Sequence, residues 1–185
     1  MTKYPWYEEI QKNNKITQGD IILNCPIPLP NEELFQAILA NKEELEASLD
    51  IKQTNIIILS QACDISNDKV DSIVVCSVWS LKTLKESNEY YKSSKARESL
   101  RQGKEPSYHL LNNYSSAGIE HEYSIVDFHR IYSLPKEYLK NIAKNTAIRL
   151  RLLPPYREHL SQAFARYFMR VGLPMDIDKE SIKNV

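Results

Sequence analysis

The sequence predicts an α+β fold: a small bent antiparallel sheet or SH3-like barrel, with helical insertions and a C-terminal amphipathic helix packed across it. The first observation is the uncharged run at 56–59, in which three of four residues are β-branched, as is typical of a strand buried on both faces. The second is a return run at 71–78 after a short polar loop, which favours an antiparallel hairpin. The third is the apolar stripe over 155–171, which Pro155 begins and Gly172 ends.

The length and composition predict one cytoplasmic domain. At 185 residues the chain can bury a core of its own, and we expect a single domain over 1–175 followed by a loose tail over 176–185. Three cysteines are an odd number, which disfavours a disulfide framework and favours a reducing compartment. The start of the chain lacks an apolar run of signal-peptide length, and no run approaches a transmembrane span. We therefore expect no membrane partner.

Three shorter elements precede the buried strand. Residues 5–11 are expected to form a short helix, and 16–23 a first strand. The three prolines of 25–30 should end that strand, because proline cannot pair in the interior of a sheet. Asn31 is a plausible N-cap for a helical insertion over 32–49, which forms one amphipathic helix or two short ones.

The second half of the chain alternates between helices and strands. Residues 80–102 form helix readily but are poorly amphipathic, which predicts an exposed insertion. Strands are expected at 107–111 and 122–132, and Pro135 should begin a helix. Residues 147–153 form either an edge strand or the lead into the last helix.

A basic block lies near the C-terminus. The formal net charge is zero, yet residues 130–172 carry nine Lys and Arg against two Asp and Glu. Such a block suits nucleic acid or an acidic protein partner, and the alternative is a solvated helix face. The candidate binding residues in it are Arg130, Arg149, Arg151, Arg157, Arg166 and Arg170.

The polar box at 60–64, Ser-Gln-Ala-Cys-Asp, is the first candidate site. Cys63 would be a nucleophile if a histidine lay within hydrogen-bond reach, with Asp64 beside it. Ser60 and Gln61 would instead help to bind a ligand by hydrogen bonding. In the structural alternative, Asp64 caps the loop, Cys63 is a small buried hydrophobe, and Ser60 and Gln61 satisfy backbone groups.

Asp127 and His129 are the second candidate pair. They lie two residues apart on one face of a predicted strand, close enough for the carboxylate to orient the imidazole, as in half of an acid–base pair. The alternative is a polar pair on a solvated sheet face. The cysteines and the remaining histidines lack ligand spacing, so we expect no metal and no cofactor.

Three segments resemble the opening strands of the MazF/PemK toxin endoribonucleases, which are small SH3-like barrels: Gln-Gly-Asp-Ile at 18–21, Ile-Ile-Ile-Leu-Ser at 56–60, and Ile-Val-Val-Cys-Ser-Val at 73–78. Segments 107–111 and 125–131 match the positions of that family's closing strands. The family's catalytic arginine has no counterpart at 53–55, and its threonine falls near Ser77 or Ser80. The resemblance thus implies a barrel core more than it implies ribonuclease activity. The box at 60–64 also resembles a group of uncharacterised bacterial proteins.

The leading interpretation is a binding module derived from a toxin-like barrel, which acts on nucleic acid or an acidic protein through its basic C-terminal face. The alternative is an enzyme that works at the Ser60–Asp64 rim, either a degenerate endoribonuclease or a Cys-dependent hydrolase. A second copy of the chain is a further partner that we expect.

Overall fold

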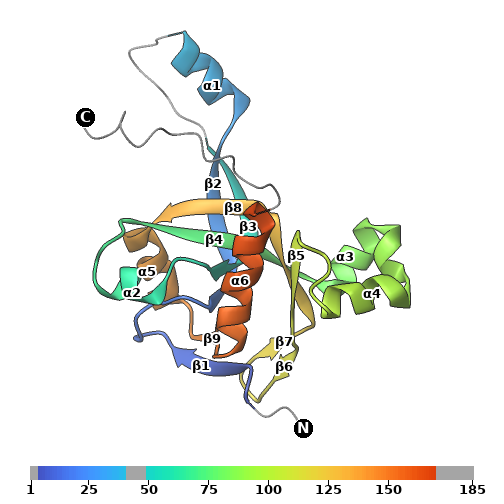
Figure 1. Ribbon diagram of the computed structural model, residues 1–185. Coiled ribbons are helices and arrows are strands. Elements are labelled where there is room, and N and C mark those ends of the chain that lie inside the picture. Colours follow the sequence, from blue (N-terminus) through green and yellow to red (C-terminus); the bar gives the residue numbers. More distant parts are fainter. Residues whose placement is uncertain (1–3, 41–48, 170–185) are drawn as a thin grey trace, which may run out of the picture.

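The computed structural model describes residues 4–40 and 49–169, which form a large antiparallel sheet with helices on both of its faces (Figure 1). The sheet order is β1-β9-β2-β3-β4-β8-β5. The strands span Tyr7–Gln11 (β1), Asp20–Pro30 (β2), Leu49–Ile58 (β3), Ser72–Ser80 (β4), Tyr108–Leu111 (β5), Ser124–Pro135 (β8) and Ile148–Leu152 (β9). A separate two-stranded sheet pairs β6 (Tyr114–Ser115) with β7 (Glu120–His121).

The helices enter between these strands. They are α1 (Glu32–Leu39), α2 (Ala62–Ser66), α3 (Leu81–Ser87), a 3₁₀ turn η1 (Glu89–Lys92), α4 (Ser94–Arg101), α5 (Lys136–Asn145) and α6 (Tyr156–Phe168). The predicted α+β class is therefore confirmed. The longest described helix, α6, has 13 residues, and no helix in the described ranges combines the length and apolarity needed to span a bilayer.

The large sheet is open and not closed into a barrel, with β1 and β5 as its two edges. Side chains bring those edges close, since the Tyr7 hydroxyl of β1 donates to the carbonyl of Asn112 just beyond β5 at 2.7 Å. The ring of Tyr7 also packs edge-on against Tyr114 of β6. The sheet is thus curved and bridged by side chains across its opening.

The predicted interior strand is confirmed at the centre of the sheet. Ile56, Ile57 and Ile58 have no exposed surface, and β3 pairs with β2 on one side and β4 on the other. Burying each such side chain contributes about 1.5–3 kcal/mol. Ile57 packs with the cluster under α6, whereas Ile56 and Ile58 pack with the cluster under α5. The strand therefore contributes to the core on both faces.

The N-terminal segment is a strand and not the expected helix. Residues of β1 pair with β9 in the register Tyr7 to Leu152, and Tyr7 and Ile10 are buried. The helix prediction was wrong because pairing with a strand 140 residues later in the chain outweighs weak local helix propensity.

The prolines after Cys25 do not end the second strand, contrary to expectation. β2 continues to Pro30 and pairs with β3 along that length. Pro26, Pro28 and Pro30 alternate, so their missing N–H groups lie on one side of the strand. β3 pairs with one edge of β2 along most of its length. Along the opposite edge, β9 pairs only with Asp20 and Ile21, so the prolines further along can lie at a free edge.

The predicted insertion at 32–49 forms helix only over its first half. α1 ends at Leu39, Leu49 already belongs to β3, and 41–48 lie outside the described residues. α1 and the adjoining ends of β2 and β3 project from the body of the protein (Figure 1). None of the residues of α1 is buried.

The predicted insertion at 80–102 is helical, but it is not merely exposed. Leu84, Tyr91 and Leu100 are buried and pack against Ile125 of β8. The segment has many polar residues, so its apolar periodicity is weak and did not predict this third hydrophobic cluster. The helices α3 and α4 therefore cover one end of the sheet (Figure 1).

The C-terminal elements agree with expectation over the described range. Pro135 precedes α5, β9 is a strand, and α6 covers the first part of the predicted 155–171 helix. The rest of that helix and the predicted 176–185 tail fall in 170–185, outside the described residues.

Candidate functional site

The polar box at 60–64 mainly holds the chain together in this structure. The Ser60 hydroxyl accepts a hydrogen bond from Val74 N at 2.8 Å, and the carbonyl of Gln61 accepts from Ile65 N at the start of α2. Cys63 is exposed, with its sulfur 3.7 Å from Asp64 Oδ1. Among the described residues, no hydrogen bond joins Cys63 to a histidine.

Asp127 and His129 make the contact that the sequence suggested. Asp127 Oδ1 lies 2.9 Å from His129 Nδ1 and accepts a second hydrogen bond from the His129 backbone N–H at 3.0 Å. The carboxylate is buried, whereas about half of the imidazole surface is exposed. Arg130 Nε approaches Asp127 Oδ2 at 3.5 Å. The buried carboxylate therefore orients an imidazole that solvent can reach.

A bulge in β8 creates this arrangement. Cys76 pairs with Ile131 and Ser77 with Asp127, so residues 128–130 have no partner on β4. The bulge turns Ile131 toward the cluster under α6, while Ile125 packs with α3 and α4. Ile125 and Ile131 therefore do not share one face, as the regular alternation of the predicted 122–132 strand would require.

The box and the Asp127–His129 pair are not brought together. Within the described part of the chain, no hydrogen bond or ion pair joins Cys63 or Asp64 to either residue. The aromatic neighbours of His129 are Tyr108 and Tyr167, with ring centroids 5.6 and 5.8 Å away.

Two of the predicted binding arginines, Arg149 and Arg151, are paired with a buried carboxylate. Both pair with Asp20, whose side chain has no exposed surface, and Arg149 is equally buried. Arg151 binds Asp20 with two nitrogens, at 2.5 and 3.2 Å. Arg149 therefore offers nothing to an external ligand.

The remaining arginines do not form one face. Arg130 lies over the ring of Trp79 with its guanidinium carbon 4.4 Å from the centroid, beside the Asp127–His129 pair. Arg157 is paired with Glu158, and Arg166 reaches toward Gly103 after α4. Arg170 lies outside the described residues. The structure thus separates side chains that the sequence grouped by charge.

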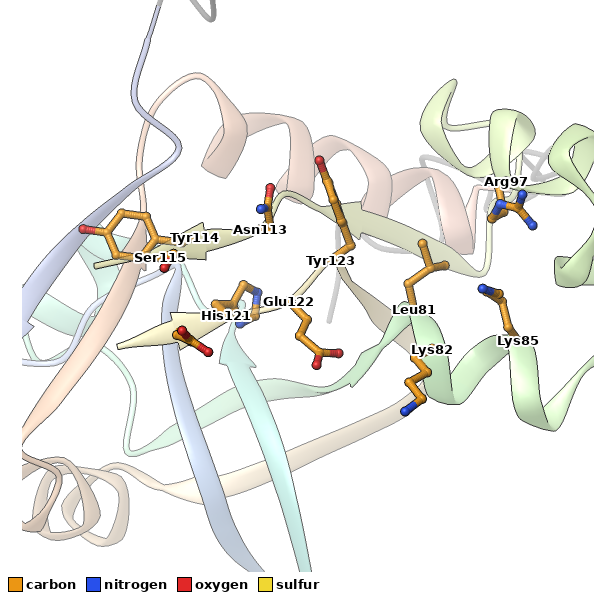
Figure 2. A pocket seen from close by; sticks show the side chains of 11 residues that line it. Leu81, Lys82, Lys85, Arg97, Asn113, Tyr114, Ser115, His121, Glu122 and Tyr123 are labelled. Carbon is orange, nitrogen blue, oxygen red and sulfur yellow. The ribbon is translucent and has the colours of Figure 1, made fainter. Parts of the chain in front are cut away.

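Two adjacent cavities form instead where the α3–α4 helices meet the small β6–β7 sheet and the start of α6. The first has a volume of about 620 Å³. Figure 2 shows its lining: Lys85 and Arg97 lie at one end, Tyr114 and His121 at the other, and Tyr123 stands between them. Half of the Tyr123 surface is exposed.

The second cavity, of about 700 Å³, shares Leu81, Arg97 and Tyr123 with the first. Its lining adds Trp6 and Tyr156, whose rings are stacked with centroids 3.7 Å apart and an interplanar angle of 10°. We call the two cavities together the aromatic groove.

Cations and carboxylates nearly balance along the aromatic groove. The cations are Lys82, Lys85, Arg97 and Arg101, and the carboxylates are Glu98, Glu120 and Glu122. Glu98 is held by Arg101, at 2.6 Å and 2.7 Å, and this contact lowers the pKa of Glu98 to about 2. Among the described residues, no ion pair joins Lys82, Lys85 or Arg97 to a carboxylate. Arg97 Nη1 donates instead to the backbone carbonyls of Tyr91 and Lys92, at 3.3 and 2.6 Å.

His109 contributes an unusual polar atom to the aromatic groove. Its Nε2 is buried and has no hydrogen-bond partner among the described residues. Burial lowers the pKa of His109 to about 4, and the nearby His159 and Arg166 act in the same direction. The imidazole is therefore neutral at pH 7.

Sequence reasoning missed the aromatic groove because its residues come from distant segments. Trp6 precedes the sheet, Arg97 belongs to the helical insertion, and Tyr156 opens the last helix. No local pattern joins them. The only signal in the sequence was the number of tyrosines, 11 in the chain, several of which fall in polar segments.

The described residues contain no group of His, Cys, Asp or Glu side chains suited to hold a metal ion. In comparisons with known proteins, no family matches the chain, and no curated protein matches its sequence. The likeness to the MazF/PemK toxins therefore stays a prediction.

Proposed function

We propose that the protein binds single-stranded nucleic acid through the aromatic groove. The observation that carries the proposal is the convergence of the Trp6–Tyr156 stack and the exposed ring of Tyr123 with unpaired cations. Proteins that bind single strands combine aromatic platforms for the bases with basic side chains along the backbone. The proposal keeps the class of partner expected from the sequence and moves it from the C-terminal arginines to this groove.

The aromatic rings supply the larger share of the expected affinity. Stacking of a base on an aromatic side chain is worth about 1–3 kcal/mol and tolerates any sequence. Tyr123 is accessible at the middle of the groove, where the two cavities meet. The neutral imidazole of His109 adds one hydrogen-bonding atom for a base edge or a sugar hydroxyl.

The cations supply a smaller, salt-dependent share. Three unpaired side chains, Lys82, Lys85 and Arg97, contacting phosphates would give a slope of log K against log salt of about −2, because single strands release about 0.7 counterion per contact. Glu120 and Glu122 reduce this attraction.

Tryptophan fluorescence provides the test. The chain has two tryptophans, Trp6 in the groove and Trp79 under Arg130. Titration with a ten-nucleotide oligothymidylate or oligouridylate should quench the fluorescence of the Trp79→Phe variant, which reports Trp6 alone. The Trp6→Phe variant should show little quenching.

Charge variants separate the groove from other surfaces. Lys85→Glu with Arg97→Glu should weaken oligonucleotide binding at least tenfold and flatten its salt dependence. Lys52→Glu, on the projecting end of β3, is the matched control and should bind normally. Binding that all these variants share equally, or no binding to either oligonucleotide, would contradict the proposal.

The Asp127–His129 hydrogen bond favours a second candidate function, an acid–base enzyme at the bulge of β8. In it His129 exchanges a proton, Asp127 orients the ring, and Arg130 stabilises an anionic group. Cleavage of a labelled RNA that His129→Ala abolishes and Cys63→Ala leaves intact would support this candidate. The reverse result would favour a Cys-dependent hydrolase at the rim.

We also propose descent from a MazF/PemK-like barrel and a cytoplasmic location. Support for the first is that the segments that carry the likeness lie on the adjacent strands β2, β3 and β4. The openness of the sheet counts against a closed barrel.

A further inference from the structure

A basic pocket lies away from the aromatic groove, between the loop after β1, the end of α2 and one face of α5. Its volume is about 580 Å³. Four lysines line it, Lys12 and Lys15 from the loop and Lys140 and Lys144 from α5, together with Arg151. Asp68 is the only carboxylate in the lining, and it is already hydrogen-bonded to Lys136.

Three of the five cations of this basic pocket have no carboxylate partner in the described part of the chain. Lys12, Lys15 and Lys144 form no ion pair with any described residue, whereas Lys140 bonds Glu137 at 2.6 Å and Arg151 is paired with Asp20. Lysines of like charge repel one another. Binding of a multivalent anion among them is therefore favourable, because it offsets this repulsion.

A single buried side chain holds the two walls of the basic pocket together. Arg149 donates to the carbonyl of Asn14 at 3.0 Å, in the loop that carries Lys12 and Lys15. It also donates to the carbonyl of Ala143 at 3.2 Å, on the helix that carries Lys140 and Lys144. Arg151 adds a bond to the carbonyl of Lys15 at 2.9 Å. The backbone segments that carry the lysines are therefore held together in the absence of a ligand.

The lining of the basic pocket also includes apolar side chains. Ile16 and Ile65 are buried members of the cluster under α5, and Ala143 belongs to the same cluster. Lysines beside an apolar patch suit a ligand with phosphates at one end and a less polar body at the other. A pocket of about 300–1,000 Å³ is of the size that holds such a molecule.

We propose that the basic pocket binds a small organic polyphosphate of the nucleoside di- or triphosphate class. The phosphates lie among Lys12, Lys15 and Lys144, and the organic part lies against Ile16 and Ile65. This site is independent of the nucleic-acid groove, with which it shares no lining residue.

Calorimetric titration of the full chain with ATP, inorganic triphosphate and adenosine tests the proposal. ATP should bind in a saturable manner at sub-millimolar concentration, triphosphate about tenfold more weakly, and adenosine hardly at all. The double variant Lys12→Glu, Lys144→Glu should lose at least tenfold in ATP affinity. The Lys82→Glu, Lys85→Glu variant is the matched control and should bind ATP normally.

Each other outcome overturns a stated part. Equal binding of triphosphate and ATP would remove the role of the apolar patch. Absence of saturable ATP binding, or ATP binding that the Lys12 and Lys144 reversals leave unchanged, would overturn the site. If an oligonucleotide displaces ATP, and the same charge reversals abolish binding of that oligonucleotide, the pocket would be assigned to nucleic acid instead. If oligothymidylate still quenches the fluorescence of Trp6 in the double variant, the proposed function of the aromatic groove stands even when the basic pocket does not bind ATP.

Discussion

The aromatic groove and the basic pocket offer anions two different kinds of contact. The helices α3 and α4, which help to line the groove, lie on the opposite side of the view from α5, which helps to line the pocket (Figure 1). In the groove, four cations face three carboxylates, and aromatic rings supply the distinctive surface. In the pocket, Lys12, Lys15 and Lys144 have no carboxylate partner among the described residues, and no aromatic side chain is part of the lining.

The difference shows how little a charge count along the chain says about where charge acts. Within the basic block, Arg149 is buried against Asp20, whereas Lys144 faces the pocket. Lys12 and Lys15, from the acidic first third of the sequence, complete the most cationic of the cavities described here. Four variants test this contrast.

The largest effect is expected from the frame of the pocket. Asp20→Ala leaves the buried Arg149 without its carboxylate and should lower the free energy of unfolding by about 3–5 kcal/mol. Urea unfolding measures this, and the exposed Lys92→Ala change, which breaks the pair with Glu89, should leave stability nearly unchanged. Equal effects of the two changes would mean that the buried pair does not support the pocket.

The second effect is a pH dependence that originates in the groove. The pKa of His109 is about 4 in the folded protein and about 6.5 when unfolded, so the unfolded chain binds more protons between these values. Stability should therefore rise with pH from about 4 to about 6.5, by up to about 3 kcal/mol from this group. His109→Gln should flatten the profile measured by urea unfolding at several pH values. An unaltered slope would show that other groups dominate.

The third effect is on binding to the groove alone. Tyr123→Ala removes a half-exposed ring, so the fold should be unaffected while oligonucleotide affinity falls about fivefold or more. Fluorescence anisotropy of a labelled oligothymidylate measures the loss. Tyr123→Phe should restore most of the affinity, because stacking needs only the ring. ATP binding should be identical in all three proteins.

The smallest effect sharpens the electrostatics of the pocket. Glu137→Gln frees Lys140 from its 2.6 Å ion pair and should raise ATP affinity about twofold, since an exposed helix pair of this kind is weak. Calorimetry detects this change. A decrease would mean that Glu137 positions Lys140 rather than competing with the ligand.

Sequence patterns located most strands, and they failed where distant residues decide the outcome. The run at 56–59 marked the central strand because an unbroken run of uncharged, mostly β-branched residues is typical of a strand buried on both faces. The segment at 7–11 is a strand because it pairs with residues 148–152, which local propensity does not reveal. The prolines of β2 were misjudged because the free edge beside them depends on where β9 stops.

The candidate sites divide in the same way. The contact of Asp127 with His129 was foreseen because the two residues are close in sequence. The bulge that shapes their surroundings was not, since it depends on the register between β4 and β8. The ranges that form the aromatic groove are separated by up to 150 residues and carry no shared motif.

By itself, the sequence determined the fold class, the buried central strand and the last helix, because these follow from periodicities within a few residues. Only the tertiary structure decided which cations are buried and which face a ligand. The position of a charged residue in the sequence does not reveal which groups will surround it. Its burial, its ion-pair partner and the cavity that it lines depend on segments that meet only in the folded protein.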